Sequence, residues 1–219
     1  MKVTQIWAGK DIIVPQDQDK ATGKMSKLTW KQLFGECDIH AMHIEHGVAC
    51  NTASKPGATD KSMSELLERV GCDTDALQAK YLSEHLQRFP FSSKRKRMST
   101  ILENVQTKNS YAKRLHIKGA SEIVKNCCSH YLDIDGNVKE MTDEMKGNLD
   151  NVINNYARQA LRTIVLAYKD LMPNECGMEH DEPKDQDVKD IEKSGLTLIC
   201  IFGIMDIVRQ EVPGAVKII

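Results

Sequence analysis

Residues 88–118 read RFPFSSKRKRMSTILENVQTKNSYAKRLHIK, and along this stretch the pattern of apolar and polar residues changes to a period of two. Its β-prone segments are Arg88–Phe91, Met98–Glu103 and Arg114–Lys118, and the polar residues Gln106–Ser110 separate the last two. Short β-prone segments that are separated by polar turns predict an antiparallel meander. We therefore expect a sheet in which these strands are neighbours.

The segments on both sides of this meander predict further strands and helices. Strands are expected at Val3–Trp7, Ile12–Val14, Arg162–Tyr168 and Leu196–Ile204, with a hairpin over Tyr131–Glu140. Helices are expected at Trp30–His46, from a capping box at Ser62 to Val70, from Thr74 to Leu86, over Ala120–Ser129 and from Thr142 to Ala160. Polar segments are expected at Met172–Lys193, with a short helix near its end, and at Asp206–Pro213. The pattern predicts an α+β domain with an antiparallel sheet of about five or six strands.

The composition is that of one soluble globular domain, with 219 residues, 41% apolar and 28% charged. A net charge of −1 excludes a global attraction to nucleic acid or to anionic membranes, so any anion binding must come from a local cluster. Seven cysteines, an odd number, and an N-terminus unlike a signal peptide indicate a reducing cytosol without disulfides. The longest apolar run, Leu196–Met205, is too short to cross a bilayer.

The only dense charge cluster is the run Lys94–Arg97, which follows Phe91. An aromatic ring can stack on a flat base, and cations can hold phosphates. Farther along the chain, Lys118 precedes Gly119 and Ala120, whose small size lets backbone approach a ligand closely. The amides of the helix expected to start there add attraction for negative charge. On composition alone, however, a core phenylalanine and a solvated basic run explain these residues better.

Several segments, taken together and in order, resemble the nucleotide-binding domain of P-type calcium-pumping ATPases, especially the plasma-membrane type. These segments are Phe91 to Ser99, Lys118–Glu122, Leu161–Asp170 and Gly203–Pro213. The resemblance covers nearly all of residues 1–219, and Lys118-Gly119-Ala120-Ser121-Glu122 is its most specific part. It implies a single domain with a sheet of about six or seven strands flanked by helices. Residues 1–5 and 204–219 are then hinge strands toward an absent phosphorylation domain.

The resemblance also implies an ATP site and the role of each residue in it. Phe91 matches the position that stacks on adenine, Lys118 the lysine on the floor of the pocket, and Arg162 the arginine that reaches the phosphates. Lys96 matches a further cation, and the remaining lining residues are Ser62, Ser92, Met98, Gly119 and Ala120.

This chain departs from the family pattern at three places. The Lys-Thr-Glu segment of the family aligns with Lys61-Ser62-Met63, so the carboxylate expected at the adenine amino group is missing, and Glu65 could replace it. Ser93 stands where the family often has arginine, and Ile207 stands at the hinge proline.

The function that the resemblance implies is to hold ATP and Mg²⁺ for transfer of the γ-phosphate to an aspartate of the missing domain. The parent would be a calcium-transporting ATPase, a hydrolase and translocase, in the plasma membrane or a related membrane. This piece would be a monomeric cytosolic part whose partners are the phosphorylation and transmembrane domains, with no nucleic acid. It carries no catalytic residue and should be inactive alone, because the Asp-Lys-Thr-Gly-Thr acceptor and the magnesium-binding Gly-Asp-Gly segment do not occur. Asp19–Lys24 imitates the acceptor, but an extra alanine spoils the spacing, which predicts a loop.

Three other features of the sequence suggest different functions. The run Lys94–Arg97 could serve a non-catalytic binding module for acidic partners or single-stranded RNA. A zinc site at His40, His43 and His46, near Cys37 and Cys50, is disfavoured because the imidazoles fan around a helix, so solvated histidines and no metal are expected. Asp133–Asn137 resembles a calcium loop, but its glycine comes too early, which favours a hairpin turn.

Overall fold

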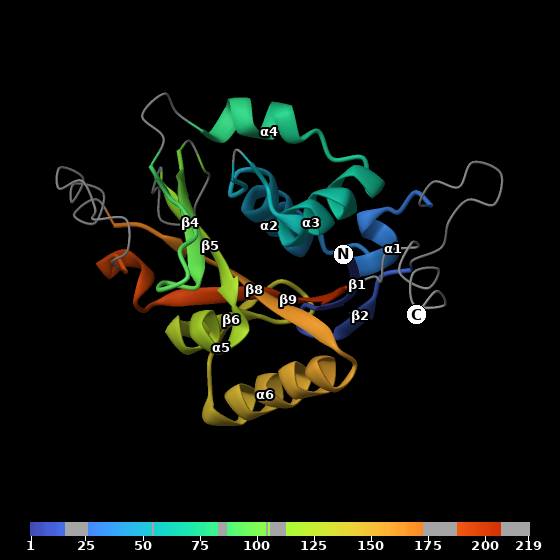
Figure 1. The fold of residues 1–219 in the computed structure, drawn as a ribbon. Coiled ribbons are helices and arrows are strands. Elements are labelled where there is room, and N and C mark those ends of the chain that lie inside the picture. The colour runs from blue at the N-terminus through green and yellow to red at the C-terminus, as the bar shows by residue number, and fades with distance from the viewer. Residues whose placement is uncertain are drawn as a thin grey trace, which may run out of the picture.

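The computed structural model describes residues 1–15, 26–53, 55–82, 87–103, 105, 113–172 and 188–206. A twisted sheet crosses the middle of the molecule, with α2, α3 and α4 on one face and α5 and α6 on the other (Figure 1). The predicted loops at Asp19–Lys24 and Gln106–Ser110, and most of the polar exit with Ile207, lie outside the described residues.

The sheet has the strand order β2-β1-β9-β8-β5-β4-β3, and every neighbouring pair along this path is antiparallel. A further hairpin, β6–β7, joins the sheet where β6 pairs in parallel with β9. The fold class predicted from the sequence, α+β with an antiparallel sheet, is confirmed. The bounds of the strands are β1 Lys2–Trp7, β2 Asp11–Ile13, β3 Arg88–Phe89, β4 Arg97–Leu102, β5 Arg114–Ala120, β6 Cys128–Leu132, β7 Val138–Glu140, β8 Leu161–Asp170 and β9 Leu196–Met205.

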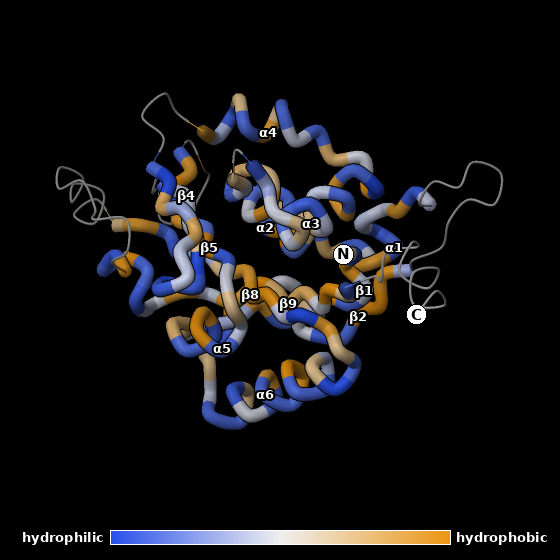
Figure 2. Tube along the Cα trace, in the orientation of Figure 1, coloured by the Kyte–Doolittle hydropathy of each residue, from blue (hydrophilic) through white to orange (hydrophobic). Residues whose placement is uncertain are grey.

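The helices cover the two faces and create two separate apolar cores. Alternate residues of β8 point to opposite faces, so Leu166 packs under α2 and α3 while Val165 packs above α6. Because both faces are covered, β8 and β9 are apolar over most of their length (Figure 2). The bounds are α1 Trp30–Phe34, α2 Asp38–Ala49, α3 Ala58–Arg69, α4 Thr74–Tyr81, α5 Ser121–Val124 and α6 Asp143–Arg158, with 3₁₀ turns η1 Lys125–Cys127 and η2 Asp190–Glu192.

Local sequence signals predicted some helix ends correctly. Thr142 caps α6, since its hydroxyl accepts a hydrogen bond from the Met145 amide at 3.1 Å. The short helix expected near the end of the 172–193 segment is η2. Among the described residues, no helix combines the length and the apolar character that a membrane span requires.

Other predicted boundaries are wrong. The helix expected over residues 30–46 is broken at Gly35, which adopts a φ of 63°, into α1 and α2. The capping box at Ser62 does not form, because α3 begins a turn earlier at Ala58 and the Ser62 hydroxyl donates to the Thr59 carbonyl at 2.7 Å. The helix expected over residues 120–129 ends early, because Cys128 already pairs with β9.

Candidate functional site

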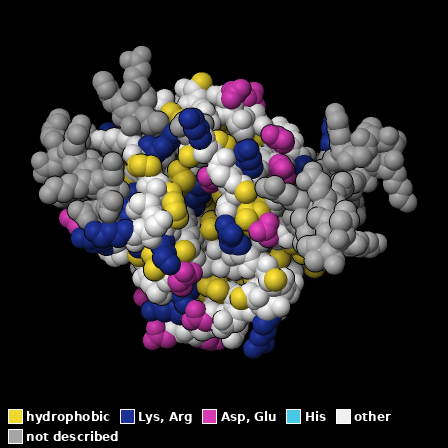
Figure 3. All heavy atoms as spheres, viewed as in Figure 1, with side chains coloured by type: hydrophobic (Ala, Val, Ile, Leu, Met, Phe, Trp, Pro, Cys, Tyr) yellow, Lys and Arg dark blue, Asp and Glu magenta, His cyan; other side chains and the backbone are white. Residues whose placement is uncertain are grey.

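A cleft of about 910 Å³ opens between the first turn of α3 and the adjoining ends of β4, β5 and β8. The surface is visibly hollowed between these elements (Figure 3). Its size suits a ligand as large as a nucleoside triphosphate. All of the residues predicted for the ATP site except Ser62 and Ser92 line it, namely Phe91, Lys96, Met98, Lys118, Gly119, Ala120 and Arg162.

Pairing within the sheet brings these distant segments together. Met98 of β4 lies opposite Lys118 of β5, and Ala120 lies opposite Ile164 of β8. Arg162 is near the start of β8, so it reaches the same end of the sheet. The cleft is therefore assembled by strand register, and no single motif contains it.

Phe91 supplies a large apolar surface at the cleft. The residue is 61% exposed, whereas neighbouring Phe89 packs partly against the core under β5. Pro90 between them lacks the amide that a continuing strand would need, and β3 ends before it. An exposed ring at the wall of a cleft can stack on a flat base.

Lys118 lies deep in the cleft and pairs with Asp60 of α3. Its side chain is 4% exposed, and its Nζ is 2.7 Å from Asp60 Oδ1. Burial lowers the pKa of Lys118, and the Asp60 carboxylate opposes that shift. The pair places a charged donor and a carboxylate acceptor side by side on the floor of the cleft.

Asp60 corrects the prediction that the cleft lacks a carboxylate. The residue assigned to that position, Met63, is a fully buried part of the lining, and Asp60 projects into the cleft one turn earlier. A signal was available, because Thr59-Asp60 is itself a threonine followed by an acid just before Lys61. The error came from aligning the Lys-Thr-Glu segment of the family at Lys61, which put Met63 where Asp60 lies.

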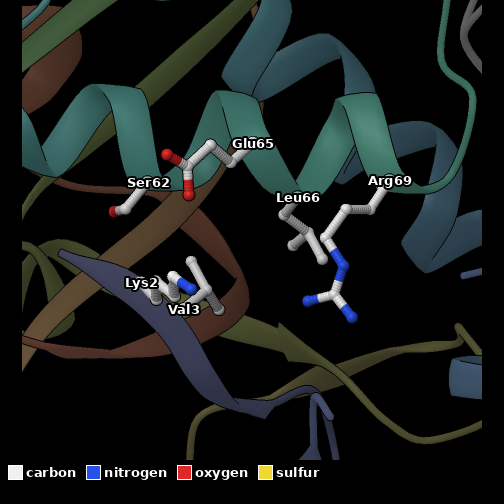
Figure 4. A pocket seen from close by; sticks show the side chains of 6 residues that line it. All are labelled: Lys2, Val3, Ser62, Glu65, Leu66 and Arg69. Carbon is white, nitrogen blue, oxygen red and sulfur yellow. The ribbon is translucent and has the colours of Figure 1, made fainter. Parts of the chain in front are cut away.

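Ser62 and Glu65 belong to a different, much smaller hollow between α3 and β1. They face Lys2 and Val3 there, next to Arg69 (Figure 4). Its volume of about 10 Å³ accommodates at most a water molecule. The predicted lining role of Ser62 and the predicted substitution by Glu65 are therefore wrong.

Cationic groups surround the other side of the cleft. Arg162 is exposed and its Nη1 donates to Thr59 Oγ1 at 3.2 Å, while Lys55 and Lys96 also line the walls. Gly57 at the N-cap of α3 provides no side-chain cap, and residues 57–60 face the cleft, so the first amides of the helix add positive potential. These groups together can attract a polyanion.

Comparison of the sequence with known proteins assigns this chain to a family. A sequence model of the family described as P-type ATPase, cytoplasmic domain N, matches residues 40–211 of the chain. The chain belongs to this family. The resemblance stated from the sequence motifs is thereby confirmed.

The relatives of this N domain are much longer proteins. It is 36% identical over 187 residues to calcium-transporting ATPase PAT1 of Dictyostelium discoideum, an alignment that covers 80% of this chain and 15% of the relative. It is 35% identical over 226 residues to probable calcium-transporting ATPase 6, plasma membrane-type, of Oryza sativa subsp. japonica, with 97% and 19% covered. For plasma membrane calcium-transporting ATPase 1 of Homo sapiens the identity is 39% over 130 residues, with 59% and 10% covered. The chain thus spans less than a fifth of these relatives.

The basic run of the N domain is divided between surface and interior. Lys94 and Lys96 are exposed, but Arg95 and Arg97 are only 3% and 7% exposed. Arg95 pairs with the buried carboxylate of Glu192, and Arg97 Nη1 donates to the Glu192 carbonyl at 3.1 Å. The run therefore does not present its cations together to a partner.

Ser92 and Gly119 shape the backbone around the cleft. The Ser92 hydroxyl accepts from the Arg95 amide at 3.2 Å and its carbonyl accepts from the Lys96 amide at 2.8 Å, so Ser92 closes a turn and is not part of the lining. A Cβ on Gly119 would lie 2.5 Å from the Lys96 carbonyl oxygen. The absence of a side chain there makes room for the backbone of Lys96 and Arg97. Gly119 also lines the cleft, and the predicted close approach of a ligand to it stays a prediction. The helix expected to start after Ala120 is a single turn, α5, and its attraction for negative charge stays a prediction.

The histidines of α2 are buried, which contradicts the prediction of solvated side chains. His40, His43 and His46 are 0%, 3% and 4% exposed, and the His43 ring stacks on Tyr168 with 4.2 Å between centroids. They face the sheet because α2 is covered on several sides by α1, α4 and the strands. Within the described residues, no group of three or more His, Cys, Asp or Glu side chains could hold a metal ion.

Proposed function

We propose that this N domain binds ATP, as its Mg²⁺ complex, in the cleft and presents the γ-phosphate to an aspartate of a neighbouring phosphorylation domain. The observation that carries the proposal is the convergence of Phe91, the Asp60–Lys118 pair and Arg162 in one cleft. An exposed ring, a deep acceptor and donor, and peripheral cations are the three features that a base joined to a polyphosphate requires.

The positions of these groups support one orientation of the nucleotide. The adenine lies against Phe91, and the free oxygen of the Asp60 carboxylate accepts from the adenine amino group. Met63 and Met98 provide an apolar lining that excludes water from the base. The phosphates then face Arg162 and Lys96, whose exposed charges attract the triphosphate.

Mg²⁺ would be held in the cleft mainly through the phosphates of ATP. When bound, it neutralises part of the phosphate charge. Two carboxylates, Asp60 and Glu122, line the cleft, and Asp60 is already paired with Lys118. Most ligands of the ion are therefore expected to come from the phosphates and from the phosphorylation domain, not from this cleft.

The names of the relatives support the wider role. Each reported relative is named as a calcium-transporting ATPase, and two carry plasma membrane in the name. We infer that the parent of this domain couples ATP hydrolysis to calcium transport across a membrane, with the domain on the cytosolic side. The phosphorylation and transmembrane domains of that parent are its partners.

A titration tests the binding proposal and the basic-module alternative together. Calorimetry with ATP, GTP and a single-stranded RNA at two salt concentrations should show a preference for ATP that persists at the higher salt. Phe91→Ala and Lys118→Ala should each weaken ATP binding at least tenfold, by loss of base stacking and of the deep donor.

Two matched controls separate local from global effects. Ile13→Ala removes another exposed apolar side chain, and Lys125→Ala removes another buried lysine that is paired with an aspartate, Asp150. Both should leave ATP binding within about twofold. Unchanged ATP binding in the two cleft variants, or RNA binding stronger than ATP binding, would overturn the proposal.

A further inference from the structure

Glu192 has a fully buried carboxylate that lies outside the cleft. It belongs to η2, and its side chain is 0% exposed. Its Oε1 accepts hydrogen bonds from Arg95 Nη2 and Ser99 Oγ, and its Oε2 accepts from the Lys189 amide at 3.0 Å. A buried charge with this many donors is compensated, so the side chain has one well-defined position.

Arg95 connects this carboxylate to the turn that carries Phe91. While its Nη2 binds Glu192, its Nη1 donates to the Pro90 carbonyl at 2.7 Å. Pro90 immediately precedes Phe91 in the sequence. The rigid guanidinium therefore holds the entrance of the turn at a set distance from Glu192.

The turn needs such support, because packing against the rest of the protein does not hold its functional side chains in place. Phe91 is 61% exposed and Lys96 is exposed, so neither gains much packing. Lys96 also has a φ of 51°, a left-handed conformation that is uncommon for a residue with a side chain. Such a conformation persists where surrounding contacts hold it.

We propose that Glu192 is a positioning residue for the nucleotide: through Arg95 it holds the Pro90–Lys96 turn so that Phe91 and Lys96 face the cleft. The proposal rests on the proposed function, since it assigns Glu192 a part in ATP binding without contact to ATP. If the Glu192–Arg95 pair only stabilised the fold, its loss would not change the position of Phe91 more than that of other residues.

The test compares two carboxylate-to-amide changes, each at the partner of a buried arginine. Glu192→Gln weakens the ion pair with Arg95. The control, Asp170→Asn, weakens the ion pair with Arg114. Arg114 is at the end of β5 that is remote from Lys118 and Gly119. The readouts are the Kd for ATP and the ¹⁹F NMR spectrum of protein labelled with fluorophenylalanine. The chain has 4 phenylalanines, and Phe91→Leu assigns the signal of Phe91.

Glu192→Gln should shift or broaden the Phe91 signal without nucleotide and raise the Kd for ATP about tenfold, as expected for losing much of one charged hydrogen bond. Asp170→Asn should leave the Phe91 signal in place and the Kd within about twofold. A folded Glu192→Gln protein with the wild-type Phe91 signal and Kd would overturn the proposal. Equal effects of both variants would overturn it too, because they would indicate general loosening.

Two further results keep the test decisive. If wild-type protein fails to bind ATP, the proposed function fails, while the ligand-free Phe91 signal still decides whether Glu192 positions the turn. If Glu192→Gln does not fold, Arg95→Lys replaces it, because one ammonium cannot reproduce the two nitrogens that separately bind Glu192 and Pro90. Arg95→Lys should shift the Phe91 signal and weaken ATP binding to a similar extent, and wild-type values for both would refute the link.

Discussion

Lys118 of β5 and Asp60 of α3 form an ion pair across the floor of the cleft, with 2.7 Å between Nζ and Oδ1. The side chains are 4% and 18% exposed, so water screens their attraction only weakly. Removing either partner would leave a buried charge without compensation. The pair therefore joins the helical layer to the sheet at the place where the base is proposed to bind.

Asp60→Asn should weaken ATP binding about tenfold and reduce the preference for ATP over GTP. The amide keeps the shape of the side chain but loses the negative charge that pairs with Lys118, and it replaces one acceptor oxygen with an NH2 donor. Its single remaining oxygen cannot fully accept from both Lys118 and the adenine amino group. Calorimetric titration with both nucleotides measures the effect. Glu65→Gln is the control, because Glu65 lies in the small hollow between α3 and β1 and should have no effect on either nucleotide.

Arg162→Gln should weaken ATP binding about tenfold but adenosine binding by less than about twofold, because its charge is proposed to act on phosphates. The salt dependence of the Kd for ATP should also become shallower. The control is Arg158→Gln, which removes an exposed arginine from the last turn of α6, on the opposite face of the sheet. Equal losses for adenosine and ATP in Arg162→Gln would contradict a phosphate role.

Gly119→Ala should destabilise the domain by about 1–3 kcal/mol, because the new methyl group would overlap the backbone of Lys96 and Arg97. Backbone atoms cannot move aside as a flexible side chain can. Gly147→Ala in α6 adds the same methyl group where no atom lies within 4 Å, and should instead stabilise by about 0.5–1 kcal/mol. Urea unfolding of both variants gives the two free energies. A destabilisation by Gly147→Ala equal to that of Gly119→Ala would refute the steric argument.

The buried histidines should make stability depend on pH. Burial lowers the pKa of His40, His43 and His116, and burial together with the charges of Arg114 and Lys80 lowers that of His46 to about 4. Asp133 opposes the shift at His40, and Arg114 adds to the shifts at His43 and His116. The folded-state pKa values lie below the unfolded value of 6.5. At pH values between the folded and the unfolded pKa, the unfolded chain therefore binds more protons than the folded chain. The contribution of the neutral histidines to the free energy of unfolding should be fully present above about pH 6.5 and decline as the pH falls toward 4. His46 alone should contribute about 3 kcal/mol.

Urea unfolding between pH 7.5 and 4.5 measures this dependence. His46→Leu should flatten the curve, because one of the groups that gain a proton on unfolding is gone. His130→Gln, which changes an exposed histidine, should leave the slope as it is. A wild-type slope in His46→Leu would show that His46 does not contribute.

Much of the site could be predicted because short, recognisable sequence motifs contain its residues. Lys118-Gly119-Ala120, Phe91 and Arg162 were assigned through the resemblance to the family, and they line one cleft, although their contact with ATP stays a prediction. Asp60 was missed because the Lys-Thr-Glu segment of the family was aligned with Lys61-Ser62-Met63. A shift of three residues, about one helical turn, exchanged Asp60 for Met63.

Periodicity along the chain determined which segments are strands and helices and hence the α+β class, because the alternation of apolar residues reflects the geometry of a single element. The tertiary structure decided which polar groups are interior. Arg95, Arg97 and the α2 histidines look like surface residues in sequence, yet each is buried by elements far away along the chain. A buried charge is tolerated only where it forms an ion pair with a partner, as Arg95 does with Glu192. Such a pair depends on packing between distant segments, which local sequence does not encode.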